Sequence, residues 1–457
     1  MWQVILGGFV VAAVSFAAFV AWVPALVRRA TQVLLTRPMS DTLAELYLSL
    51  KSTPALDFLY SSLRAQTGQI VIRPMGSARP VHGFDDLAFV PAQLAVSPLN
   101  DDHPVDLSVT IGRHAKHPLT ASMPLYISGM AYGLALTKNA RLALATAAGR
   151  AHVPLNSGQG PYLEEERRLA DRYVLQFGRW VWNRDPAILR QADMIEVQVG
   201  QGAMPGNAVV ATPGEVAPDI KRLMGLGPSD SPTIHAHLFL RDPDHPAALK
   251  EVVQHLRSEV PEVPVALKMG AGQRLEDDLD VCLEAGVDVI VIDGTEGATG
   301  NAPITLSDHF GIPTLMALCR AVRHLERRGA RREVDLFVSG GFREPGDFLK
   351  ALALGADMVG IATIAMFALA HRQITQSVPL YPPTDLVFYR AEPRIDLDVE
   401  EGAKGLANFL ESARQEMTIA LRTMGHASVH DLSPADLCAL DPTIARIADV
   451  AYAGAPP

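Results

Sequence analysis

The feature that most constrains the fold of this chain is a regular alternation of short apolar runs with helical stretches. The apolar runs lack the alternating polarity of half-exposed strands, so each is typical of a strand buried on both faces. They lie at residues 125–127, 153–155, 194–199, 233–238, 263–269, 287–292, 334–338 and 358–361. Helical stretches lie between them at residues 138–148, 246–259, 274–285, 312–327 and 345–354. Eight strands alternating with helices predict an α/β fold of the (β/α)₈ barrel type.

The rest of the chain is arranged around this expected barrel, which covers residues 85–400. An open doubly wound sheet is the alternative, but no G-x-G-x-x-G motif follows the first apolar run. Residues 29–84, amphipathic and helical around 41–63, are expected to be a connector. Residues 401–457 form a tail whose helix, at 402–421, is expected to pack on the outside of the barrel.

Charge and cysteine content exclude several classes of protein. The net charge of −10 argues against a general nucleic-acid binder, which needs a basic face. A local pocket can still hold a small anionic substrate. The three cysteines, Cys282, Cys319 and Cys438, are too widely separated for a disulfide framework, a zinc site or an iron–sulfur motif. We interpret them as residues of the core of a protein in a reducing compartment.

The N-terminus has the composition of a membrane anchor. Residues 1–27 contain no charged side chain, and about 20 apolar residues are enough for a helix to span a bilayer. Trp2 and Trp22 lie near the ends of this stretch, and Arg28 and Arg29 follow it. A secretory signal has the opposite order, with its positive charges first. We therefore expect a retained single-pass anchor at 1–28, with the remaining chain in the cytoplasm; a buried core helix is the alternative.

Glycine-rich loops follow the apolar runs. After the run at 289–292 come Asp293 and a loop with Gly294, Gly297 and Gly300. The loops at residues 128–133, 156–160 and 201–206 also follow apolar runs. The C-terminal ends of barrel strands carry the functional groups of such folds, and glycines let the backbone approach a flat or anionic group closely. The four loops are expected to ring one mouth of the barrel.

Two late segments have the composition of a phosphate site. Ser339, Gly340 and Gly341 follow one run, and Gly360 and Thr363 lie at the end of the last run. Barrels commonly bind phosphate between the loops after their seventh and eighth strands and the N-terminus of a short helix. Ordinary turn glycines are the alternative interpretation.

Lys268 lies inside the apolar run at residues 263–269. A lysine in a barrel strand costs free energy unless it is paired. It is either one partner of a buried ion pair or a cation that faces a bound group on which negative charge accumulates.

The loop motifs together resemble those of a known family. The order SGMAYG, NSGQG, IEVQVGQGAMPG, VALKMG, DGTEGATGNAPITLSDH, SGGF and ALALGADMVGIA is similar to the FMN-binding synthase domain of the glutamate synthase family, over about residues 120–425. The short, membrane-anchored, stand-alone members are the most similar. The resemblance implies a (β/α)₈ barrel with FMN. The absence of the family's N-terminal amidotransferase domain, with its leading cysteine nucleophile, is a departure from the family pattern, so glutamine hydrolysis is not expected.

The resemblance also implies roles for individual residues. Lys268 and Gln201 would address the pyrimidine edge of the flavin. The flavin ring and its surroundings would be lined by Ser128, Gly129, Met130, Asp293, Gly294, Gly297, Gly300 and Ser339. The phosphate would be held by Gly340, Gly341, Gly360 and Thr363.

The sequence departs from the family pattern where a diacid substrate would bind. The family motif Q-G-A-K-P-G uses its lysine on the 2-oxoglutarate carboxylate, and Met204 stands at that position. A family glutamine corresponds to Val210, a family glutamate to Gln159 and a second family lysine to Gln198. Losing one charge-assisted hydrogen bond costs on the order of 1.5–3 kcal/mol. A less anionic substrate, such as an imine or a 2-amino or 2-hydroxy acid derivative, is therefore expected.

The family also carries a cysteine-rich iron–sulfur segment after its last strand. The corresponding residues 367–385 contain no cysteine here, so no iron–sulfur cluster is expected.

Three residues are candidates for acid–base chemistry near the mouth. Tyr132 is the expected proton donor, because a phenol beside a flavin can protonate a substrate during hydride transfer. Glu296 either ionises within its glycine-rich loop or caps a turn. His309 is expected to hold the loop by hydrogen bonds.

These observations predict a membrane-tethered FMN oxidoreductase that acts on a small molecule by hydride transfer at flavin N5. An electron donor or acceptor protein is a further expected partner, without a residue that identifies it. A flavin-binding or non-catalytic membrane scaffold or sensor on the same barrel is the alternative. A 2-hydroxy-acid oxidase would need an Arg–His pair near the late strands, and none is evident at residues 339–343.

Overall fold

The computed structural model describes most of the chain, in two units. The described residues are 2–38, 43–72, 76–77, 79–178, 180–204, 209–210, 215–234, 248–297, 300, 302–377, 384–390 and 395–455. The first unit is Met1–Val71 and the second is Ile72–Pro457. The expected connector at 29–84 is therefore divided, because the residues from Ile72 onward belong to the unit that contains the barrel.

The first unit consists of three helices, α1 (Trp2–Thr36), α2 (Leu43–Ser52) and α3 (Ala55–Thr67). Pro54 starts α3, and Gly68 ends it in the left-handed conformation. Within α1, Ala18–Thr36 is long and apolar enough to cross a membrane. Its large apolar side chains are exposed, Phe19 and Trp22 by about three-fifths. A signal sequence or a core helix meets the same criteria of length and composition.

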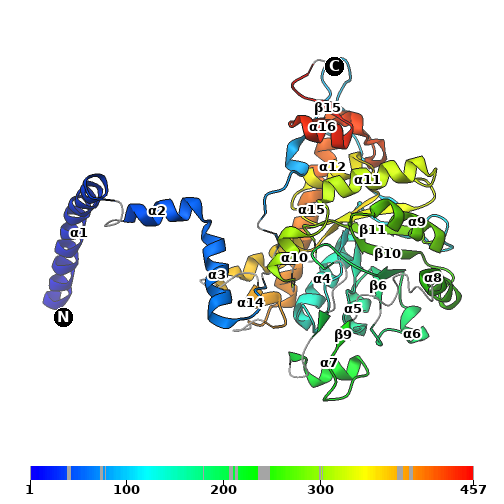
Figure 1. Ribbon diagram of the computed structural model, residues 1–457, viewed down its shortest axis with the longest axis horizontal. Helices are drawn as coiled ribbons and strands as arrows, with labels where there is room; N and C mark the ends of the chain where they lie inside the picture. The colour runs from blue at the N-terminus through cyan, green and yellow to red at the C-terminus, as the bar shows by residue number, and fades with distance from the viewer. Residues whose placement is uncertain are drawn as a thin grey trace. The chain divides into compact units, whose positions relative to one another are not determined.

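The second unit is built on a closed barrel of eight parallel strands (Figure 1). The strands in order around the barrel are β4 (Leu125–Ile127), β5 (Pro154–Asn156), β6 (Arg172–Phe177), β7 (Met194–Gln198), β10 (Val265–Gly270), β11 (Val289–Asp293), β12 (Asp335–Ser339) and β13 (Met358–Ile361). Strand β13 pairs with β4 and closes the barrel. The predicted fold class is confirmed.

One of the predicted strands is wrong. The described part of the run at 233–238 is β9 (Thr233–Ile234), which pairs antiparallel with β8 (Val209–Val210) outside the barrel; residues 235–238 lie outside the described part. The barrel strand that was not predicted is β6, where Arg172 and Gln176 interrupt the apolar pattern. Gln176 is nevertheless buried. It binds the Glu196 carboxylate, so a polar side chain is stable at this position in the barrel.

Helices surround the barrel. They are α4 (Lys138–Ala151), α5 (Glu164–Leu169), α6 (Pro186–Leu189), α7 (Pro218–Leu223), α8 (Ala248–Glu259), α9 (Leu275–Ala285), α10 (Ile304–His309), α11 (Thr314–Arg327), α12 (Pro345–Ala353), α13 (Thr363–Ala370), α14 (Thr384–Val387), α15 (Val399–Met424) and α16 (Pro442–Ala448). The long tail helix α15 packs on α4, α13 and α12, as expected for a helix outside the barrel. Its apolar stripe is buried there.

Besides the β8–β9 pair, the described part of the second unit contains two further small sheets. Strand β14 (Leu437–Ala439) lies between β1 (Leu87–Phe89) and β15 (Ala451–Tyr452). Strands β2 (Val109–Ile111) and β3 (Leu119–Ala121) form a hairpin. The side chains of the barrel strands are almost entirely buried, so the barrel is a packed core whose loops are free to build a site at one end.

Candidate functional site

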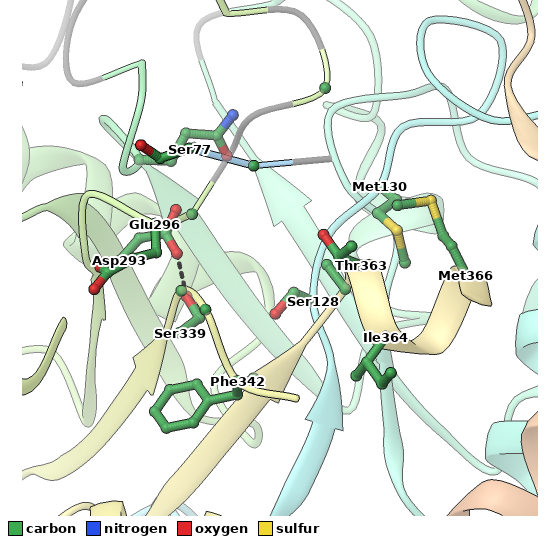
Figure 2. A pocket seen from close by; sticks show the side chains of 18 of the residues that line it. Ser77, Ser128, Met130, Asp293, Glu296, Ser339, Phe342, Thr363, Ile364 and Met366 are labelled. Carbon is green, nitrogen blue, oxygen red and sulfur yellow. Dashed lines mark hydrogen bonds between the residues drawn. The ribbon is translucent and has the colours of Figure 1, made fainter. Parts of the chain in front are cut away.

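A cavity of about 780 Å³ opens at the carboxyl ends of the barrel strands. This volume lies in the range of small-molecule and cofactor sites. Its wall includes residues from the loops after β4, β5, β7, β11, β12 and β13, as the four glycine-rich loops predict. Figure 2 shows Asp293, Glu296 and Ser339 on one side of it and Met130, Thr363 and Met366 on the other.

The loops after β4 and β5 are held by a buried ion pair. Arg141 on α4 and Glu166 on α5 form two hydrogen bonds of 2.5 and 2.7 Å. The same guanidinium donates to the carbonyls of Met130 at 2.8 Å and Asn156 at 3.0 Å. One arginine therefore fixes the backbone of both loops. Sequence reasoning missed it, because charged residues on an amphipathic helix are normally solvated.

Ser128 and Gly360 lie close together at the base of the cavity. A Cβ atom on Gly360 would lie 2.5 Å from Ser128 Oγ and 2.6 Å from the Tyr126 ring. A side chain at this position of β13 would therefore force neighbouring side chains to shift. The Tyr126 and Ser128 hydroxyls are buried and have no hydrogen-bond partner among the described residues. Burial raises the pKa of Tyr126 well above its usual value, so the phenol stays protonated.

Lys268 is buried on β10 and lines the cavity. Its ammonium forms neither an ion pair nor a hydrogen bond with any residue that the structure describes. The interpretation as one half of a buried ion pair is therefore not supported. Because an unpaired buried cation is costly, its position favours a bound group with negative charge in the cavity.

Asp293 ties three parts of the site together. Its Oδ2 accepts a hydrogen bond from the Gly202 backbone N–H at 2.8 Å, and its Oδ1 accepts one from Ser339 Oγ at 2.5 Å. A Cβ atom on Gly297 would lie 2.3 Å from the same carboxylate. Gly294 lies beneath, where an added Cβ would meet Thr314, and it does not line the cavity. Asp293 thus orients the loops, and Gly294 supports them from outside the wall.

Glu296 caps a helix. Its Oε2 accepts hydrogen bonds from the backbone N–H of Thr314, the first residue of α11, at 2.9 Å and from Thr314 Oγ1 at 2.6 Å. Burial raises the pKa of Glu296, while the bonds from Thr314 oppose that rise. The side chain also lines the cavity. Of the two predicted roles, the structure supports capping.

The expected phosphate cradle has the required backbone geometry. Gly340 and Gly341 have φ values of 114° and 80°, which L-residues with side chains rarely adopt. Their backbone N–H groups donate no hydrogen bond to another described residue. Helix α13 begins at Thr363 beside them, and its first N–H groups are likewise free for a ligand. These donors suit a bound dianion.

Two predicted acid–base residues lie elsewhere. Tyr132 does not line the cavity; it packs in a second apolar cluster that includes Trp182 and Ile220. The proton-donor role predicted for it is therefore not supported. Burial raises its pKa, with a further contribution from the charge of Asp219. His309 is exposed, and its imidazole forms no hydrogen bond with a described residue.

The neighbouring residue, Asp308, forms hydrogen bonds of the kind that were expected of His309. Asp308 Oδ1 accepts a hydrogen bond from Ser77 Oγ at 2.7 Å, and its carbonyl accepts one from Arg79 at 3.3 Å. Residues 76–77 and 79–85, which we call the strap, thereby lie at the mouth, and all of them except His82 line the cavity. The sequence analysis placed the strap residues up to Phe84 in the connector, because nothing local indicates a contact across 231 positions.

A buried polar cluster that was not predicted lies under the same mouth. Glu196 Oε1 accepts hydrogen bonds from Asn156 at 2.9 Å and from Gln176 at 2.7 Å. Gln176 reaches the cavity wall, whereas Glu196 Oε2 is buried without a partner among the described residues. Amide donors therefore hold a carboxylate at the centre of the barrel.

The remaining predicted residues form a wall without charge. Gln159, Gln201 and Met204 all line the cavity, as do Gly129 and Gly300. Gln198 is buried but does not line it. The side chain of Val210 lies outside the described part of the structure. No histidine lines the described part of the cavity, so the Arg–His pair of a 2-hydroxy-acid oxidase is not formed there.

The cysteines lie away from this site. Cys282 on α9 and Cys319 on α11 are buried, as expected, and Cys438 on β14 is half-buried. Burial raises the pKa of Cys319 to about 11. Among the described residues no group of three or more His, Cys, Asp or Glu side chains is arranged to hold a metal ion.

Comparisons of the sequence with known proteins identify one family. The family profile "Conserved region in glutamate synthase" matches residues 85–427. The glutamate synthase large subunit-like protein of Rhizobium meliloti is 33% identical over 427 residues, which cover 88% of this chain and 95% of that protein. The archaeal-type NADPH glutamate synthase of Thermotoga maritima is 28% identical over 399 residues, covering 81% and 76%. Among solved structures, a flavocytochrome b2 variant has a TM-score of 0.50 at 18% identity, covering 82% and 80%, which supports the fold alone.

Proposed function

Since this chain belongs to the glutamate synthase family, a family of oxidoreductases, we propose that it is an FMN-dependent oxidoreductase acting on a CH–NH₂ or imine carbon. The observation that carries the proposal is Lys268, a buried lysine without a counter-ion at the wall of the barrel-mouth cavity. A cation there stabilises negative charge on a bound group, which is what a reduced flavin requires.

The residues of the cavity fit FMN. Gly340, Gly341 and Thr363 offer free backbone donors for its phosphate. Lys268 and Gln201 provide polar groups for the pyrimidine edge. Ser128, whose buried hydroxyl lacks a partner among the described residues, has a donor to offer on the same wall. When bound, FMN supplies hydride transfer at N5.

The chain's own residues prepare the cavity for this chemistry. Arg141 holds the carbonyls of Met130 and Asn156, so the loops after β4 and β5 keep one conformation. Asp293 fixes the Gly202 backbone and Ser339 on the opposite side. Rigid loops on both sides lower the entropy that is lost when a planar ligand binds. The strap adds Ser77, Arg79 and Phe84 to the wall of the same cavity.

The proposal is tested by the absorbance spectrum of the detergent-purified full chain, followed by anaerobic photoreduction. We expect the bands of oxidised flavin, which bleach to a stable hydroquinone. Mass analysis of the released cofactor should give FMN. A colourless protein that free FMN cannot restore would instead favour a membrane scaffold or sensor on the same barrel.

We further propose that 2-oxoglutarate is not the substrate. The loop after β7 presents Met204, which cannot bind a carboxylate, and Gln159 on the wall is also uncharged. The substrate is therefore less anionic than a five-carbon diacid. Ammonia-dependent oxidation of a nicotinamide or other electron donor by 2-oxoglutarate, at a rate of about 1 s⁻¹ or faster, would contradict this.

Helix α1 is proposed to anchor the protein to a membrane, with the barrel on the cytoplasmic side. Exposed apolar side chains along Ala18–Thr36 support this, and Arg28 and Arg29 suit a cytoplasmic flank. Membrane fractionation with alkaline extraction tests the anchor, and protease protection tests its orientation. A mature protein whose N-terminal sequence begins after residue 36 would show that the helix is a cleaved signal instead.

A further inference from the structure

The strap brings a basic side chain to the cavity from outside the family domain. Three basic residues line the described cavity, namely Arg79, Lys268 and Arg343. Arg343 lies 3.8 Å from Asp85, and Lys268 is assigned to the flavin under the proposed function. Arg79 has a single hydrogen bond, to the Asp308 carbonyl at 3.3 Å, and no carboxylate partner among the described residues. A guanidinium carries five N–H donors, so most of its capacity is free.

The strap is held in place by contacts along its length. Ser77 Oγ donates to Asp308 Oδ1 at 2.7 Å. The Phe84 ring lies 5.0 Å from the Phe342 ring, and Lys350 Nζ donates to the Phe84 carbonyl at 2.9 Å. These contacts lie on both sides of Arg79 and join the strap to the loops after β11 and β12. Arg79 is therefore positioned beside the mouth rather than on a free end.

One part of the cavity wall carries no charge, and this limits the number of anionic groups that a substrate can have. Gln159, Gln201 and Met204 present amides and a thioether to the cavity. Four acidic side chains line the described cavity, Asp85, Asp293, Glu296 and Asp347, and acidic groups do not favour a second anion. Asp293 already accepts hydrogen bonds from Gly202 and Ser339, and Glu296 accepts one from Thr314. Once Lys268 and the glycine cradle are used for the flavin, Arg79 is the remaining cation without a counter-ion among the described residues that line the cavity.

We propose that Arg79 binds the carboxylate of the substrate, and that the substrate is a monocarboxylic 2-oxo or 2-amino acid with an uncharged side chain. An arginine matches the planar geometry of a carboxylate through two parallel hydrogen bonds. The uncharged wall accepts the rest of the molecule. This inference rests on the proposed function for the assignment of Lys268, and it adds the substrate class and a binding residue that precedes the family domain.

Calorimetric titration of the full chain in detergent tests the proposal, because it does not depend on the colour or activity of a flavin. Pyruvate is the monocarboxylate probe, pyruvamide its neutral counterpart and 2-oxoglutarate the diacid. Arg79→Ala should weaken pyruvate binding at least about tenfold, since a charge-assisted pair is lost. Arg79→Lys should retain part of the affinity. Ser77→Ala, which frees the strap, should weaken binding by a smaller factor.

The matched control is Arg414→Ala, because Arg414 is an exposed arginine paired with Glu411 on the outer helix α15. It should bind pyruvate as the unmodified chain does. Flavin content, measured separately, should be the same in Arg79→Ala and the unmodified chain.

Several results would overturn the proposal. These are pyruvate affinity that is unchanged in Arg79→Ala, absence of binding by any of the acids, pyruvamide binding as tightly as pyruvate, and 2-oxoglutarate binding more than about tenfold tighter than pyruvate. Loss of flavin from Arg79→Ala would show that this arginine holds the cofactor, which also overturns it. A protein without flavin that still binds pyruvate through Arg79 would refute the proposed function alone.

Discussion

Asp293 and Ser339 join two neighbouring barrel strands through a hydrogen bond of 2.5 Å between Ser339 Oγ and Asp293 Oδ1. Both residues are the last of their strands, β11 and β12, and their Cα atoms are paired in the sheet. The other carboxylate oxygen holds the Gly202 backbone N–H. One side chain thus couples the loops after β7, β11 and β12, which form one side of the cavity.

This coupling predicts different costs for two substitutions. Asp293→Asn keeps one acceptor oxygen for two buried donors, so it should lower the free energy of unfolding by about 2 kcal/mol. Ser339→Ala removes only the donor and should cost about 1 kcal/mol. Chemical denaturation followed by circular dichroism measures both. Equal stability of the two variants would mean that the Gly202 contact contributes nothing.

Gly360 offers a test of close packing at the base of the cavity. A Cβ atom there would lie 2.5 Å from Ser128 Oγ, so Gly360→Ala should displace Ser128 and cost about 1–3 kcal/mol. Flavin content should fall with it. Gly272→Ala is the control, because a Cβ atom on Gly272 meets nothing within 4 Å. If both variants keep full stability and flavin, the strand has room that the structure does not indicate.

The buried Arg141–Glu166 pair is expected to be intolerant of single changes. Its side chains are 0% and 2% exposed. Arg141→Met leaves a buried carboxylate without its partner and should lower the free energy of unfolding by about 3–5 kcal/mol. The double variant Arg141→Met with Glu166→Leu should recover much of that loss, because no charge then remains buried. A double variant that is less stable than Arg141→Met would contradict this.

The sequence predicted those parts of the site that depend on local patterns, but not those that depend on contacts between residues far apart in the chain. The apolar runs and the glycines after them are local signals, and they placed Ser128, Gly340 and Lys268 at one mouth. The helix register did not show that Arg141 is buried, because its partner Glu166 lies on another helix. Strand β6 was not predicted for a similar reason. A glutamine such as Gln176 normally indicates an exposed position, and the sequence does not show that it binds Glu196.

The positions of Tyr132 and His309, which do not support the roles predicted for them, also have a physical cause. Both follow or lie within loops of the mouth, but sequence position does not determine the direction of a side chain in a loop. Tyr132 turns into an apolar cluster, where burial of its ring is favourable. His309 is exposed at the end of α10, while the preceding residue, Asp308, contacts the strap. The strap itself depends on contacts that no local pattern encodes.

Stability is expected to depend on pH through Asp335. Burial, followed by the charge of Asp357, raises the pKa of Asp335 to about 6 from 3.8. The folded chain therefore binds a proton in this range that the unfolded chain releases. The resulting stabilisation is complete below the unfolded pKa and is lost as the pH rises through about 6. The loss amounts to no more than about 3 kcal/mol.

Asp335→Asn should remove that dependence, since Asn can still accept the Gly112 backbone N–H now bound at 2.6 Å. The variant should gain stability over the unmodified chain between pH 4 and 7, measured as the midpoint of thermal unfolding at each pH. Asp277→Asn, at an exposed position, controls for the loss of a carboxylate. Parallel pH profiles of the unmodified chain and Asp335→Asn would rule out this carboxyl as the source.

The strongest link between the cavity and its chemistry is Lys268, and its removal should change the flavin rather than the fold. Lys268→Met replaces an unpaired buried cation by an apolar side chain of similar length, so stability should be unchanged or higher. The reduced flavin loses a charge-assisted interaction of about 1.5–3 kcal/mol, which makes the two-electron potential about 30–60 mV more negative. Spectroelectrochemistry of the flavin-loaded protein measures the shift. Lys404→Met, at an exposed position on α15, should leave the potential unchanged. If Lys268→Met leaves the potential unshifted, the ammonium of Lys268 does not face the flavin. The ammonium would then be available to bind the substrate instead.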